Sequence, residues 1–136
     1  MSTIAEPLAD ATLGRAWVAF TTLLTWAVFL QAVTAGRILT GDEWARDAHR
    51  IAAGLVTIAA VVGGLIALVR LRDRAGGHRL GLMLLAIGVG LLLQHGLGTA
   101  AANSEDTLWL HIPVGVALVI LLMRLDMFAR RLRRRA

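Results

Sequence analysis

Two short segments place a histidine near the beginning of a long apolar run. His49 lies in RDAHRIAAG (residues 46–54) and His111 lies in LWLHIPVG (residues 108–115). A neutral imidazole is a common metal ligand and needs no compensating charge. It is also an accepted axial ligand of haem iron. The two segments therefore suggest metal or haem ligation, which depends on how the rest of the chain positions them.

Each of these histidines follows a glutamine at almost the same distance. Gln31 precedes His49 by 18 positions, and Gln94 precedes His111 by 17 positions. In both cases the glutamine lies near the end of one apolar run and the histidine near the start of the next. The chain thus reads as two similar helical hairpins, which suggests an internal duplication. We expect the two glutamines to form hydrogen bonds across helices.

The composition indicates that these hairpins lie in a membrane. The chain has 136 residues, of which 57% are hydrophobic, and a mean hydropathy of +0.70. Only helices and closed barrels satisfy their backbone hydrogen bonds in lipid, and a helix needs about 20 apolar residues to cross it. We predict an all-α integral membrane up-down four-helix bundle built from two hairpins. It forms one transmembrane domain (residues 1–136), with helices over 16–38, 43–69, 80–101 and 105–128 and a basic cytoplasmic tail over 129–136.

The charged residues give an orientation rather than a nucleic-acid site. All 14 cations are arginines, and the net charge is +5. One side of the predicted bundle carries eleven of them, and the other side carries Arg37, Arg46 and Arg50. The positive-inside rule then puts both termini in the cytoplasm, in a multi-pass protein of the plasma membrane. We expect the lipid bilayer as a partner, with the basic tail near anionic lipid, and no nucleic acid, because no folded reader module is present.

The predicted helix starts place the two histidines at one depth. Thr40 begins a T-x-x-E capping box and is the expected N-cap of the second helix. Asn103 is the expected N-cap of the fourth. His49 lies nine residues after Thr40, and His111 lies eight residues after Asn103, or about 12 Å along each helix. The second and fourth helices are diagonal in a sequential bundle, so the two imidazoles should face each other across its axis.

A haem b between these helices would receive one axial ligand from each side. Ala53 and Gly115 each follow a histidine by four residues, so they lie on the same helix face and leave room for the macrocycle. We expect the haem propionates to pair with the cations at this end, which are Arg37, Arg46 and Arg50. The chain has no cysteine, so covalent c-type attachment, thiolate ligands and disulfides are excluded.

His95 is a third histidine at similar depth, directly after Gln94. We favour a role in supporting the ligands through hydrogen bonds. Three other roles remain open for His95. It could be an alternative axial ligand, a hydrogen-bond partner of a propionate, or part of a quinone site.

These residues resemble those of haem A synthase, a protein of cytochrome oxidase assembly that has two four-helix halves. This chain is similar to one half. It also resembles half-length bacterial membrane proteins with Q-x-x-x-A-G in helix 1, an HR pair opening helix 2 and H-x-P/N-x-G in helix 4. The matching residues are Gln31 with Ala35-Gly36, His49-Arg50, and His111-Ile112-Pro113-Val114-Gly115. The resemblance implies His49 and His111 as haem ligands and covers about residues 16–128.

Three functions follow as hypotheses. The first is a haem b protein for electron transfer or haem handling, without catalytic residues of its own. The second is a dimeric haem-modifying enzyme like haem A synthase, in which a homodimer rebuilds the two halves and Glu43 in the outer loop is the catalytic carboxylate. The third is an accessory subunit of a larger membrane complex, without a cofactor. The protein partners we expect are a second copy of the chain, as a homodimer, or a larger membrane redox complex.

Overall fold

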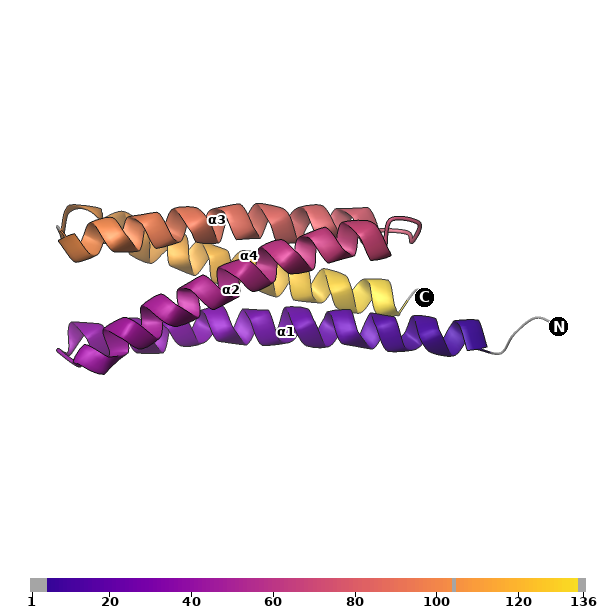
Figure 1. Ribbon diagram of the computed structural model, residues 1–136, viewed down its shortest axis with the longest axis horizontal. Helices are drawn as coiled ribbons and strands as arrows, with labels where there is room; N and C mark the ends of the chain where they lie inside the picture. Colours follow the sequence, from indigo (N-terminus) through magenta and orange to yellow (C-terminus); the bar gives the residue numbers. More distant parts are fainter. Residues whose placement is uncertain (1–4, 104, 135–136) are drawn as a thin grey trace.

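The structure, a computed structural model, describes residues 5–103 and 105–134 and consists of helices joined by short connections (Figure 1). The elements in chain order are α1 (Ala5–Leu39), α2 (Glu43–Arg70), α3 (Gly77–Asn103), the short 3₁₀ helix η1 (Glu105–Thr107) and α4 (Leu108–Arg133). The predicted fold class, an all-helical up-down four-helix bundle, is confirmed.

Each long helix contains a segment that is long and apolar enough to cross a membrane. These segments are Leu13–Leu39, Glu43–Arg70, Gly77–Asn103 and Leu108–Arg133. Large apolar side chains are exposed on every helix, for example Leu23, Ile58, Leu93 and Ile120. Such a surface is favourable where the surrounding solvent is lipid rather than water. These are the features of a multi-pass membrane protein.

The four helices form a ring in chain order. α1 packs against α2 and α4, and α3 packs against α2 and α4. Within the described ranges, the Cα atoms of α2 and α4 do not come within 8 Å of each other, and neither do those of α1 and α3. The second and fourth helices are therefore diagonal, as the short connections predict.

The two ends of the bundle differ in their connections, and we name them after their characteristic residues. The histidine end carries the α1–α2 turn (residues 40–42) and η1. The arginine end carries the α2–α3 loop (residues 71–76) and the last turn of α4. Figure 1 shows α2 lying beside α3 at the arginine end and diverging from it toward the histidine end. The α1–α2 and α3–α4 hairpins thus separate where the histidines lie.

Glycines allow the close approach of α2 and α3 in the arginine half. A Cβ atom at Gly64 would lie 3.0 Å from the backbone nitrogen of Leu85, and one at Gly81 would lie 3.0 Å from the carbonyl oxygen of Gly64. A larger residue at either position would push the backbones apart. Small residues at helix interfaces are the usual basis of close packing in lipid.

The α1–α2 turn shows that the predicted N-cap at Thr40 is wrong. Gly41 has φ of +92°, a left-handed conformation that glycine adopts without a steric penalty and that commonly ends a helix. The Thr40 hydroxyl donates to the carbonyl of Arg37 (2.9 Å). Thr40 therefore belongs to the end of α1, and Asp42 is the N-cap residue of α2.

The predicted N-cap at Asn103 is also wrong, because Asn103 is the last residue of α3. The chain then forms η1, and α4 begins at Leu108 with Thr107 as its N-cap residue. The Thr107 hydroxyl donates to the carbonyl of Leu97 (3.1 Å), which ties this connection to α3. As a result His49 lies seven residues after its N-cap and His111 only four.

Three helices are longer than predicted, and α3 exceeds its predicted range (80–101) at both ends. α1 begins at Ala5 rather than residue 16, and α4 continues to Arg133 rather than ending at residue 128. Apolar length marks the part of a helix that crosses lipid, whereas the helix itself can continue into water. Arginines at the carboxyl end of α4 also interact favourably with the helix dipole. Most of the predicted basic tail is thus helical, and its last two residues lie outside the described ranges.

The most tightly packed part of the core lies in the arginine half. The largest fully buried side chains are Leu80, Leu84, Leu122, Leu125 and Thr21. Toward the histidine end the core closes with Val28, Val56, Leu91 and Leu118, one residue from each helix.

A polar cluster ties α1 to α4 in this half. The Asp126 carboxylate accepts hydrogen bonds from the hydroxyls of Thr21 (2.9 Å) and Thr22 (2.7 Å). It also pairs with Arg130 Nε at 2.7 Å, and the same guanidinium donates to Thr22 (2.9 Å). The carboxylate has donors on both oxygens, so its burial is compensated.

Candidate functional site

The two predicted ligands, His49 and His111, and the two glutamines that precede them lie directly beyond the last layer of the core. Gln31 follows Val28 by three residues, and Gln94 follows Leu91 by three residues. His49 precedes Val56 by seven residues, and His111 precedes Leu118 by seven residues. Both spacings keep a residue on the helix face that carries the core residue. The two hairpins therefore direct the same pair of side chains inward at the histidine end.

The imidazole of His49 is held by α1. The hydroxyl of Thr34 lies 2.9 Å from Nδ1 of His49 and donates its proton to the carbonyl of Gln31 (3.0 Å). A hydroxyl has a single proton to donate, so when Thr34 donates to the Gln31 carbonyl, Nδ1–H of His49 is the donor to Thr34 Oγ1. In that arrangement His49 is the tautomer with a free lone pair on Nε2. That is the nitrogen a metal would use, with Nδ1 held by its hydrogen bond.

The imidazole of His111 is held by α3. The side-chain amide of Gln94 donates to the carbonyl of His111 (2.7 Å), and its nitrogen lies 3.5 Å from Nε2 of His111. This confirms that Gln94 bonds across helices. Two glycines make room for the pair. A Cβ at Gly115 would lie 3.0 Å from the Gln94 amide nitrogen, and a Cβ at Gly98 would lie 2.9 Å from Cε1 of His111.

The two imidazoles lie beside each other, although they come from diagonal helices. The ring centroids of His49 and His111 are 6.3 Å apart, and the ring planes make an angle of 61°. The pair is formed despite the unequal depths of the two residues along their helices. Their side chains therefore bridge the α1–α2 and α3–α4 hairpins at the end where the helices diverge.

Three buried polar atoms of the described residues at this site have no hydrogen-bond partner. They are Gln31 Oε1, Gln94 Oε1 and His111 Nδ1. An unsatisfied buried polar atom costs about 1–3 kcal/mol, and such atoms are rare in native structures. Their concentration at one end of the bundle marks a polar site suited to an additional binding partner.

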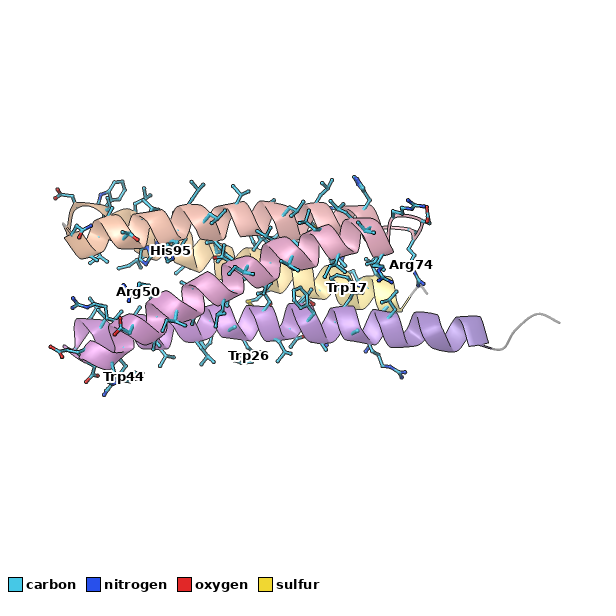
Figure 2. All side chains as sticks on the ribbon, in the orientation of Figure 1. Trp17, Trp26, Trp44, Arg50, Arg74 and His95 are labelled. Carbon is cyan, nitrogen blue, oxygen red and sulfur yellow. The ribbon has the colours of Figure 1, made fainter. Side chains whose placement is uncertain are left out.

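His95 lies at the same end but on the surface. Its side chain is exposed on α3, and it is close enough to His49 for an electrostatic interaction. Figure 2 shows His95 and Arg50 at the histidine end, and Trp17 and Arg74 at the opposite end. The structure brings His95 near the histidine pair without burying it between the helices.

The arginines predicted to meet propionates are exposed, and two of them pair with carboxylates. Arg37 Nε lies 2.6 Å from Asp42 Oδ2, and Arg50 lies 3.1 Å from Asp47 Oδ1. Arg46 is exposed on α2. Because exposed ion pairs contribute little to stability, these arginines can exchange their carboxylate partner for another anion.

The other predicted site residues occupy different surroundings. Glu43 is the exposed first residue of α2 and precedes His49 by six positions. Ala53 is half-buried, and its carbonyl accepts a bond from Thr57 (2.8 Å). Gly115 faces Gln94, so in this structure its missing side chain makes room for an amide.

Thr34 and Gly98 were missed by the sequence analysis, although spacing could have identified both. Thr34 follows Gln31 by three residues, and Gly98 follows Gln94 by four residues. These intervals place each residue on the same helix face as its glutamine.

In the described part of the chain, no group of three or more His, Cys, Asp or Glu side chains forms a metal-binding cluster.

Comparison of the chain with protein-family models, with curated proteins and with solved structures finds no match.

Proposed function

We propose that this chain is a membrane haem b protein in which His49 and His111 are the two axial ligands. The observation that carries the proposal is the pair of imidazoles from diagonal helices, with ring centroids 6.3 Å apart. Two metal–nitrogen bonds of about 2 Å each, with the ring centres slightly further out, span roughly 6 Å. The separation therefore suits two imidazoles with one iron between them.

The hydrogen bonds of the pair support the same function. Thr34 holds Nδ1 of His49 and leaves Nε2 free. The orphaned oxygens of Gln31 and Gln94 lie buried near the pair. Haem ligands are normally oriented by such neighbouring groups, which fix the ring and adjust the basicity of the coordinating nitrogen.

Haem would supply one-electron chemistry, and the chain would supply its ligands and surroundings. Since α2 and α3 diverge toward this end (Figure 1), the two hairpins are the units that would accommodate the macrocycle between them. Arg37, Arg46 and Arg50 are available near the surface for the propionates.

The orientation of the chain is part of the proposal. The arginine end carries the α2–α3 loop, with Arg72 and Arg74, and the carboxyl end of α4. The latter holds Arg130, Arg131, Arg133 and Arg134, and Arg70 and Arg79 flank the loop. By the positive-inside rule this end faces the cytoplasm of a plasma-membrane protein. A redox partner, or a second copy of the chain, would then meet the haem from the outer face.

A reduced-minus-oxidised absorbance spectrum of the full chain tests this function. The protein would be expressed in haem-replete cells and purified in detergent beside His49→Ala and His111→Ala. We expect one haem per chain and a sharp low-spin b-type band that both substitutions abolish. His78→Ala is the matched control, because His78 is exposed near the start of α3 at the opposite end, and it should keep the band.

Two results would overturn the proposal. One is a folded protein that remains colourless after reconstitution with haem, which would favour an accessory subunit without a cofactor. The other is six-coordinate haem retained at full stoichiometry in both alanine variants.

A further inference from the structure

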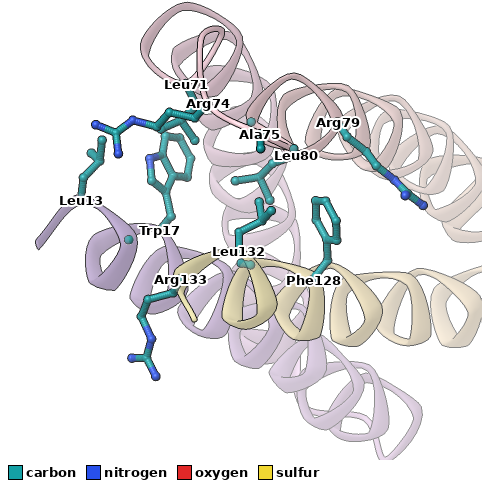
Figure 3. A pocket seen from close by; sticks show the side chains of 14 residues that line it. Leu13, Trp17, Leu71, Arg74, Ala75, Arg79, Leu80, Phe128, Leu132 and Arg133 are labelled. Atoms are coloured by element: carbon teal, nitrogen blue, oxygen red, sulfur yellow. The ribbon is translucent and has the colours of Figure 1, made fainter. Parts of the chain in front are cut away.

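A cavity lies at the arginine end, on the opposite side of the bundle from the histidine pair. Its volume is about 470 Å³, within the range of about 300–1,000 Å³ that is usual for small-ligand sites. Much of its wall is apolar, with Trp17 from α1, Leu80 from α3, and Phe128 and Leu132 from α4. Figure 3 shows the Trp17 ring projecting from α1 toward the loop that carries Arg74.

Three arginines contribute to the wall of the same cavity, and Figure 3 shows their guanidinium groups at its rim, pointing outward to different sides. Arg74 comes from the α2–α3 loop, Arg79 from the first turn of α3 and Arg133 from the end of α4. The guanidinium of Arg79 lies 5.2 Å from the ring centroid of Phe128. Gly77, the first residue of α3, is also in the wall, and the amino end of a helix favours a nearby negative charge. The cavity therefore combines an apolar wall with a positive rim.

We propose that this cavity binds an anionic phospholipid, with an acyl chain along the apolar wall and the phosphate among the arginines. The occupant is chosen by charge and location. Guanidinium groups suit phosphate geometry, and the cavity opens at the end of membrane-spanning helices, where headgroups lie. Anionic lipids concentrate in the cytoplasmic leaflet, which is where the positive-inside rule puts this end. A zwitterionic lipid has the same acyl chain, but it carries no net charge, so the three arginines attract it less strongly.

This site is independent of the proposed haem site. The two occupy opposite ends of the bundle and share no residue. Either can be absent while the other is present, and the experiments that test them use different probes.

Trp17 provides a local reporter of lipid binding. Replacing Trp26, Trp44 and Trp109 by Phe leaves Trp17 as the single tryptophan of the chain. This protein, in detergent micelles, would be titrated with phosphatidylglycerol or with phosphatidylcholine, each carrying bromine atoms on the acyl chain. We expect phosphatidylglycerol to quench Trp17 at a concentration about tenfold lower than phosphatidylcholine, from the contribution of several arginines near the phosphate.

A second single-tryptophan protein and two double substitutions serve as comparisons. Retaining only Trp26, which is 59% exposed on α1, should give equal quenching by the two lipids, because it reports lipid around the bundle. Arg79→Gln with Arg133→Gln should abolish the preference at Trp17. Arg72→Gln with Arg134→Gln removes the same charge from residues that do not line the cavity, and this variant should keep the preference.

Equal quenching of Trp17 by both lipids would overturn the proposal. So would loss of the preference in the Arg72→Gln and Arg134→Gln protein to the same extent as in the cavity variant, since that result would mean a general effect of charge.

Discussion

His49 and Thr34 are joined by a hydrogen bond of 2.9 Å between Nδ1 and Oγ1, and the threonine hydroxyl lies 3.0 Å from the carbonyl of Gln31 as a donor. These two contacts engage Nδ1 of the imidazole and leave Nε2 for another partner. They also connect α1 to α2 at the position where the bundle diverges. The histidine pair is thus held by residues of α1 and α3, the two helices that carry neither histidine of the pair.

Thr34→Val should weaken haem binding by about tenfold or more, the usual effect of removing a group that orients a metal-bound histidine. Valine has a similar shape but no oxygen that could form the hydrogen bond with Nδ1 of His49. Haem titration of the purified apoprotein, followed by the low-spin absorbance band, measures the change. Thr34→Ser restores the hydroxyl and should recover most of the affinity. Equal affinity in the valine variant and the original protein would show that this bond does not support a ligand.

Gly98→Ala should disturb the site while Gly96→Ala should not. A methyl group at residue 98 would lie 2.9 Å from Cε1 of His111, whereas at residue 96 nothing lies within 4 Å. Alanine also stabilises an exposed helix position by about 0.5–1 kcal/mol relative to glycine, so the two variants share any gain in helix stability. We expect Gly98→Ala alone to lose haem affinity, as measured by the same titration. Identical haem affinities of the two variants would mean that the ring of His111 can shift to make room for the methyl group.

Asp126→Ala should destabilise the bundle by about 2 kcal/mol, because it leaves the hydroxyls of Thr21 and Thr22 and the exposed guanidinium of Arg130 without their acceptor. Unfolding in mixed micelles with increasing SDS, followed by circular dichroism, measures the difference. Arg130→Ala should lower the free energy of unfolding less in the Asp126→Ala background than in the original protein. If the two substitutions lower it additively, the two side chains are not coupled.

Single cysteines can test the orientation, since the chain has none of its own. Asp106→Cys places an exposed thiol at the histidine end, and Asp73→Cys places one at the arginine end. A membrane-impermeant maleimide should label the first in intact cells and the second only after permeabilisation. The opposite pattern would place the histidine pair at the cytoplasmic face and the arginine-lined cavity at the outer face.

The helices were predictable from the sequence, but their ends were not. Apolar runs and the requirement for internal hydrogen bonding in lipid define four helices without knowledge of their contacts. The start of α2 depends on Gly41, whose left-handed backbone assigns Thr40 to α1 instead. A capping pattern of four residues does not contain that information. The start of α4 was missed because η1 lies between Asn103 and Leu108.

The histidine pair was predictable because it depends on topology, whereas its surroundings depend on side-chain contacts. Short connections make α2 and α4 diagonal, and this alone brings His49 and His111 to opposite sides of one axis. The roles of Thr34 and Gly98 become visible only once the rings are placed. The pairing of Arg37 and Arg50 with neighbouring carboxylates likewise depends on the local course of the helices.

The tight contact of α2 and α3 at Gly64 and Gly81 has a mechanical consequence. It lies far from the histidines, so a change of crossing angle at this contact would move the distant part of α2 as a lever arm. His49 is 15 residues from Gly64, or about 22 Å along a helix, and a rotation of about 5° at this contact therefore moves His49 by about 2 Å. A small change in the tilt of one hairpin, such as a thicker or thinner bilayer imposes, is magnified into a change in the distance between the two imidazoles.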